Sequence, residues 1–128
     1  MMPLTKEWVG KAEGDFATAG REFRARRSPN YDSTCFHCQQ CALNYLRARL
    51  QEASIPFKFR HNLQTLVKIG RPVDRSWSEL LPATGALKQF TQRVLYPGAS
   101  ATKDQAKDAV ARCRAIRSFV RQSLGLKA

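Results

Sequence analysis

The sequence predicts an all-α protein, an antiparallel up-and-down bundle of four long helices plus one short helix. Apolar residues recur at intervals of three and four along the chain, and no segment alternates as a strand would. Proline and glycine gather between these periodic stretches. A chain of 128 residues with 43% hydrophobic content can bury one core, so we expect residues 1–128 to form a single domain.

The first helix is predicted from apolar residues spaced by four, four, three and four, namely Trp8, Ala12, Phe16, Ala19 and Phe23. Thr5 is its expected N-cap. The segment Ser28-Pro29-Asn30 should end it, because proline disfavours helical geometry in the residue before it.

The second helix is expected to begin near Asp32 or Ser33 and to end near Ala53. Its inner side should carry Cys35, Cys38, Ala42, Tyr45, Leu46 and Leu50. A loop over residues 55–60 leads to a short third helix from Asn62 to Ile69.

Gly70-Arg71-Pro72 separates the third helix from a fourth, expected from Ser76 to Leu95. Pro82 either kinks the fourth helix or starts a second segment after one short turn. The last helix should span residues 103–124, because Thr102 and Gln105 match a capping box and Gly125 is a natural stop.

The formal net charge is +12, from 22 basic and 10 acidic side chains. This excess favours polyanionic partners such as nucleic acid or an acidic protein face, although solubility alone also explains basic small proteins. The chain has no run of eighteen apolar residues and no signal-peptide core at its start. We therefore expect a cytoplasmic protein that does not engage a membrane.

Three of the four cysteines, Cys35, Cys38 and Cys41, recur every third residue, and Cys113 lies far along the chain. A rise of about 9 Å along a helix separates Cys35 from Cys41, which is too far for thiolates that share one zinc ion. Cysteine also suits close helix packing. We expect packing roles for them, and neither a metal nor a cofactor.

One side of the second helix is polar, and it carries His37, Gln40, Asn44, Arg47 and Gln51. Imidazole and amide groups can hydrogen-bond a base or a phosphate. An ordinary solvated face remains the alternative. His61 opens the third helix, where it either caps the loop or contributes to an anion site.

Basic residues gather at the end of the first helix, on the second helix with the loop beyond it, where Arg60 lies, and on the last helix. On the last helix four of them form a stripe that could follow a phosphate backbone: Lys103, Lys107, Arg114 and Arg121. Aromatic residues are sparse between the charges, which argues against extended base stacking.

Three short motifs resemble, in order and spacing, those of the HEPN domain family: Phe36-His37-Cys38-Gln39-Gln40-Cys41-Ala42, His61-Asn62-Leu63 and Tyr96-Pro97. The usual family forms are Phe-His-Ala-Gln-Gln-Ala-Ala, His-Asp-Leu and Arg-Tyr-Pro-Asp. The resemblance covers essentially the whole chain. It implies a helical bundle that is commonly a homodimer, binds nucleotides or RNA, and is often the partner of a minimal nucleotidyltransferase, as in toxin–antitoxin pairs.

The ribonuclease members of that family carry an arginine separated from a histidine by four to six residues. Here nine residues separate Arg27 from His37, and His61 follows Arg60 directly. The arginine expected before Tyr96 is Leu95, with Arg93 two residues earlier.

The sequence therefore favours a non-catalytic module that binds nucleotides or RNA through His37, Gln40, Asn44, Arg47, Arg60, His61, Arg93 and Tyr96, together with the basic stripe. One alternative is an atypical metal-independent ribonuclease toxin that uses His37 or His61 with Arg93. Another is an interaction domain whose basic surface meets an acidic protein.

Overall fold

Five α-helices and one 3-10 helix form the part of the chain that the computed structural model describes, which is residues 1–94 and 96–128, with side chains for 1–90 and 96–128. The predicted all-α class is confirmed. In chain order the elements are α1 (Pro3–Arg24), α2 (Tyr31–Glu52), α3 (Leu63–Gly70), the 3-10 helix η1 (Arg75–Leu80), α4 (Leu81–Val94) and α5 (Lys103–Ser123).

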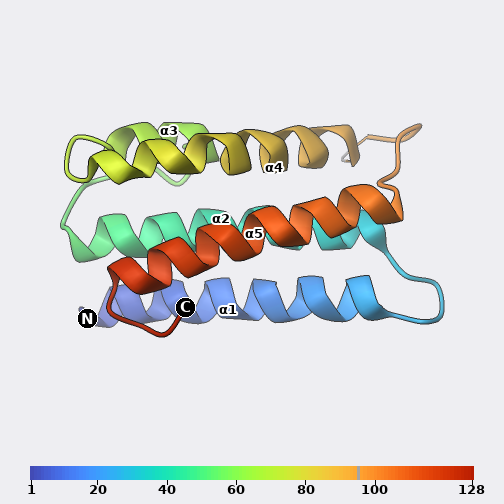
Figure 1. Ribbon diagram of the computed structural model, residues 1–128, viewed down its shortest axis with the longest axis horizontal. Coiled ribbons are helices and arrows are strands. Elements are labelled where there is room, and N and C mark those ends of the chain that lie inside the picture. Colours follow the sequence, from blue (N-terminus) through green and yellow to red (C-terminus); the bar gives the residue numbers. More distant parts are fainter. Residues whose placement is uncertain (95) are drawn as a thin grey trace.

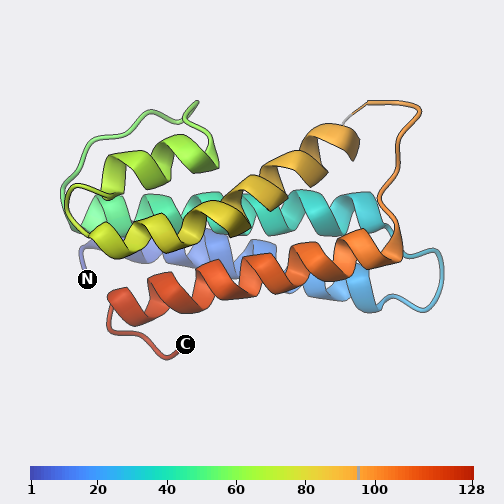
Figure 2. The same ribbon diagram turned by 45° about the horizontal axis from the view of Figure 1, so that its top comes forward.

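The four long helices α1, α2, α4 and α5 alternate in direction, as predicted (Figure 1). Helix α2 is central, because it packs against α1, α3, α4 and α5. Helix α1 covers one side of it, whereas α3 and α4 cover the other, and α5 runs alongside (Figures 1 and 2). The other helices therefore surround the second half of α2, where residues 41–48 are all buried.

The start of α1 differs from the prediction. Thr5 is not the N-cap, because α1 begins at Pro3 with Met2 at the cap position. Thr5 is instead fully buried, and its hydroxyl donates a hydrogen bond of 2.9 Å to the carboxylate of Glu52 at the end of α2. The backbone N–H of Met2 donates to the same oxygen. A residue expected to cap one helix thus joins two helices.

Helix α2 begins slightly earlier than predicted, at Tyr31, because Asn30 is its cap and accepts a hydrogen bond from the backbone of Ser33. Asp32, one of the two predicted starts, lies in the first turn of α2. Its carboxylate accepts a 2.6 Å hydrogen bond from the Ala101 backbone, which fixes the segment before α5.

The single fourth helix expected from Ser76 is divided into η1 and α4. Pro82 is the second residue of α4, where a proline needs no backbone hydrogen-bond partner, so the alternative of a second segment is confirmed. The expected end at Leu95 lies outside the described residues. The capping box at Thr102 and Gln105 is confirmed, and Gly125, with φ of 75°, follows the end of α5.

The core contains the apolar residues that the sequence assigned to the inner side of α2, and each of them is fully buried. All four cysteines are buried as well, so their predicted packing role is confirmed. The Cys113 thiol hydrogen-bonds with Cys38 and Cys41 across the α2–α5 interface. These hydrogen bonds, followed by burial, raise the pKa of the Cys38 and Cys41 thiols.

Candidate functional site

Two polar residues of α2, His37 and Asn44, contact α1 rather than a common pocket. His37 is half-buried, and its Nδ1 atom lies 3.1 Å from Oδ1 of Asp15 on α1. The second oxygen of Asp15 accepts a 3.0 Å hydrogen bond from the amide of Asn44, which is 7% exposed. One carboxylate therefore binds two residues that are seven positions, or two helical turns, apart on α2.

Arg47 extends this chain of contacts to the loop before α3. It is 4% exposed, and its two terminal nitrogens donate to the Asn44 side chain at 3.0 Å and to the Phe59 carbonyl at 3.1 Å. The guanidinium also lies over the Phe59 ring at 4.5 Å and the Trp8 ring at 5.5 Å. Burial lowers the pKa of Arg47. These contacts make Arg47 an anchor for the loop.

The other residues predicted for the site are spread over the fold. Gln40 is half-buried on α2, and Arg60 is exposed in the loop before α3. His61 is half-buried in that loop, and its Nδ1 atom accepts a hydrogen bond from the Lys58 backbone. Tyr96 is 73% exposed in the turn after α4, and the side chain of Arg93 lies outside the described residues. The loop before α3 and the turn after α4 are well separated along the bundle (Figure 2).

The basic stripe of α5 divides into two parts. Lys103, Lys107 and Arg114 are exposed. Arg121 is largely buried, donates a 3.1 Å hydrogen bond to the hydroxyl of Tyr45, and lies 3.6 Å from the Glu13 carboxylate. Its guanidinium is therefore already engaged within the protein.

Glu13 is the centre of a polar clasp, which we define as Glu13, Tyr45, Arg117 and Arg121. Arg117 donates two hydrogen bonds of 2.7 Å to the two Glu13 oxygens, and Tyr45 donates one of 2.5 Å. The bond with Arg117 holds the pKa of Glu13 below its ordinary value, although burial opposes this. The clasp joins α1 to α5 through a bidentate ion pair and to α2 through Tyr45.

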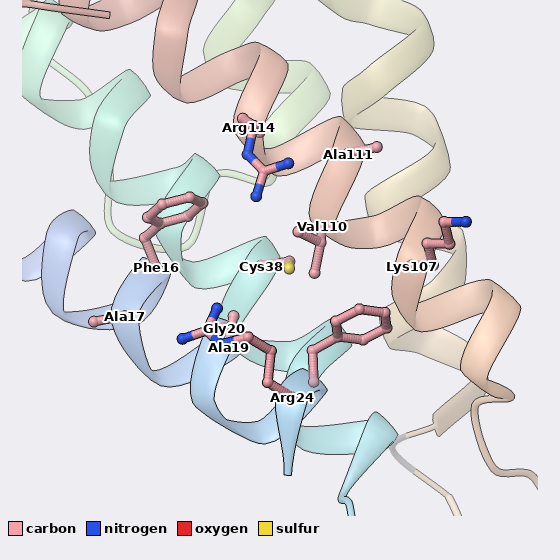
Figure 3. Close-up of a pocket in the computed structure, with 11 residues that line it drawn as sticks. Phe16, Ala17, Ala19, Gly20, Arg24, Cys38, Lys107, Val110, Ala111 and Arg114 are labelled. Carbon is pink, nitrogen blue, oxygen red and sulfur yellow. The ribbon is translucent and has the colours of Figure 1, made fainter. Parts of the chain in front are cut away.

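Beyond the clasp, α1 and α5 diverge and leave a groove of about 440 Å³. Phe16 and Phe23 of α1, Cys38 of α2 and Val110 of α5 give it apolar surface, as Figure 3 shows for the residues it labels. Three cations, Arg24, Lys107 and Arg114, also line the groove, and among the described residues no carboxylate does. An apolar hollow edged by cations is suited to a ligand with a flat apolar part and a negative charge.

Sequence reasoning did not find this groove, although it did single out several of its residues. Phe16 and Phe23 belonged to the predicted inner face of the first helix, and Lys107 and Arg114 to the basic stripe. The feature of the sequence that relates to the groove is a set of small residues that leave the space between α1 and α5 unfilled: Ala17, Ala19, Gly20 and Ala111. Such residues predict a close helix contact as readily as a gap, so the sequence alone does not decide between them.

The fold and the groove together define a helical-bundle domain with a cationic groove at its surface. The chain belongs to the HEPN domain family, because the family's model matches residues 5–123, which is nearly the whole chain. Membership supports a function related to nucleotides or RNA. No curated protein and no solved structure matches the chain.

The described residues contain neither a metal cluster nor a membrane-spanning helix. Within residues 1–94 and 96–128 no cluster of three histidine, cysteine, aspartate or glutamate side chains is arranged to hold a metal ion. Over the same residues, none of the helices has the length and apolar character needed to cross a bilayer.

The clasp makes a prediction about stability and pH. Glu13→Gln removes the charge that binds Arg117, and we expect it to lower the free energy of unfolding at pH 7 by about 1 kcal/mol, a modest value because Glu13 is 35% exposed. The folded-state pKa of Glu13 lies below the ordinary value of 4.5, so its stabilisation is present above that pH and is lost as the pH falls through the folded-state pKa.

Urea unfolding at pH 7 and pH 3 measures this effect. The difference between wild type and Glu13→Gln should shrink at the lower pH. Glu7→Gln is the matched control, because Glu7 is exposed on the same helix. A loss of stability that is equal for the two variants, or that does not depend on pH, would contradict the role given to the clasp.

Proposed function

We propose that this protein is a non-catalytic module that binds nucleotides or RNA. The observation that carries the proposal is the groove between α1 and α5, where Arg24, Lys107 and Arg114 surround apolar and aromatic surface without an acidic neighbour in the lining. Family membership supports the same class of ligand. The net charge of +12 adds a long-range attraction for any polyanion.

The cations of the groove are available to a ligand. Among the residues that the structure describes, Arg112 pairs with Asp108, and Arg117 and Arg121 pair with Glu13. No ion pair of that kind holds Arg24, Lys107 or Arg114 within the same part of the chain. Phosphate can therefore bind these three side chains without displacing an internal carboxylate.

A second candidate function, an atypical ribonuclease, is favoured by the pair His37 and Asp15. A carboxylate that orients an imidazole is the arrangement of a general base, and His37 keeps part of its surface open to solvent. Against this function, the Arg-x4-6-His spacing is absent, and Asp15 also binds the buried Asn44. The same contact is explained by the packing of α1 on α2.

The proposal also includes two protein partners, a second copy of this chain and a nucleotidyltransferase. We expect a homodimer in the cytoplasm that works with a minimal nucleotidyltransferase in a toxin–antitoxin-like pair, as the HEPN resemblance implies.

The first prediction from this proposal concerns salt. Lys107→Gln combined with Arg114→Gln should weaken RNA binding and lower the slope of log affinity against log salt by about 1.4, or about 0.7 per lost contact on a single strand. Arg71→Gln with Arg75→Gln removes the same charge from exposed positions directly after α3 and at the start of η1, on the opposite side of α2 from α1. An unchanged slope in the first variant, or an equal change in both, would remove the groove from the proposal.

The second prediction concerns catalysis. Purified protein incubated with RNA in the presence of a chelator should leave the RNA intact, because the Arg-x4-6-His spacing is absent and His37 is paired with Asp15. Gel analysis of labelled RNA provides the measurement. Cleavage that disappears in His37→Ala or in His61→Ala would establish the ribonuclease instead.

The third prediction concerns assembly. Sedimentation should give twice the chain mass of 14.5 kDa, and a small nucleotidyltransferase encoded beside this chain should co-purify with it. A monomer at all concentrations argues against the homodimer. Retention of a protein partner without binding of nucleotide or RNA at low salt would favour the purely structural interaction domain.

A further inference from the structure

The groove begins where the direct contact between α1 and α5 ends. At Glu13 and Arg117 the clasp joins the two helices directly. One to two turns further along α1 come Ala17 and Gly20, and the facing part of α5 carries Ala111. These small side chains do not fill the space between the diverging helices. The Cys38 position of α2 lies behind the gap (Figure 3).

The aromatic residues of the groove line the gap and already have partners within the protein. Arg117 lies 4.6 Å from the centre of the Phe16 ring, which fixes that ring beside the clasp. Phe23 packs on Tyr31 at a centroid distance of 6.3 Å. Both phenylalanines are only partly buried. A planar ligand part that entered the gap would cover apolar surface that now faces water.

The cations are placed at separate points rather than at one end of the groove. Lys107 and Arg114 are seven residues apart on α5, which corresponds to about 10 Å along the helix. Arg24 is on the opposite wall, on α1. In Figure 3 Arg114 extends from α5 toward the gap, on the side of Phe16. Its guanidinium is 6.0 Å from the Phe16 ring centre.

This separation distinguishes two kinds of phosphate ligand. A free nucleoside triphosphate carries all its charge on one side of the base, and it would be best bound by cations gathered together. A nucleotide within a strand has a phosphate on each side of its sugar, so separated cations match it better. The groove combines that separation with room and apolar surface for one base.

We infer that the groove between α1 and α5 binds one unstacked base of a single-stranded RNA, with the flanking phosphates on Lys107, Arg114 and Arg24. This inference rests on the proposed function and names its ligand more closely. Stacking on Phe16 and Phe23 would tolerate any base, because every base has a flat face. A duplex would bind less well, since its bases are already stacked and paired.

Gly20 offers a test that leaves the fold intact. A Cβ atom at this position would lie 2.8 Å from Nη1 of Arg24, whose guanidinium folds back over the glycine. Gly20→Ala should therefore push Arg24 aside and place a methyl group in the lining. Gly14→Ala is the matched control, because a Cβ there meets nothing within 4 Å. Both substitutions improve helix propensity, so both variants should unfold at a slightly higher temperature than wild type.

The experiment compares two RNA strands of about ten nucleotides, a length within the range of small single-strand sites. One is abasic throughout, and the other carries a single central base on the same backbone. We expect wild type and Gly14→Ala to bind the strand with the base about 5- to 150-fold more tightly, as stacking of one base would give. Gly20→Ala should lose most of that preference.

Each outcome separates the inference from the proposed function. If both strands bind equally well to wild type with a normal salt dependence, the base site is overturned and RNA binding stands. If neither these strands nor a fully based strand binds at low salt, the proposed function itself fails. If a free nucleoside triphosphate competes as strongly as the strand with one base, the assignment to a strand is overturned.

Discussion

Helix α2 lies between α1, α4 and α5, so polar groups on its second half are cut off from water and are stabilised by partners inside the protein. Helix α1 supplies two of these partners. Asp15 binds Asn44, and Glu13 binds the Tyr45 hydroxyl. Hydrogen bonds to a carboxylate in this partly dry setting are stronger than they would be in water. Together with apolar packing, these contacts hold α1 against α2, and α1 forms one wall of the groove.

The placement of Glu13 also determines which basic side chains stay unpaired and can bind a ligand. The protein has few acidic residues, and Glu13 pairs with both Arg117 and Arg121 where the helices meet. Further along, α1 and α5 have no acidic residue in the groove, so the positive charge of Arg114 is uncompensated there. The groove keeps its positive charge because Glu13, the carboxylate that joins α1 to α5, lies at the clasp and not in the groove lining.

Local patterns predicted the helices well, since periodicity and capping depend on neighbouring residues alone. The Thr102 capping box and the inner side of α2 are examples. The polar face of α2 was identified too, but its surroundings were not, because a face with His37 and Asn44 reads as solvated until another helix covers it. Thr5 was misassigned for the same reason, since its partner Glu52 lies 47 residues away. The groove depends on how α1 and α5 diverge, which no local pattern encodes.

Charge and apolar surface contribute differently to recognition at such a groove. Attraction between phosphates and Lys107, Arg114 or Arg24 would weaken as salt rises, because each counterion released from the strand gains less entropy at a higher salt concentration. Burial of a base against Phe16 and Phe23 does not depend on counterion release, and kosmotropic salts strengthen it. A purely cationic patch would therefore bind any polyanion at low salt and would release every polyanion alike as the salt concentration rises. A groove with both features keeps a preference for exposed bases when the salt concentration rises, and this would let the domain distinguish single strands from the much larger pool of duplex phosphate.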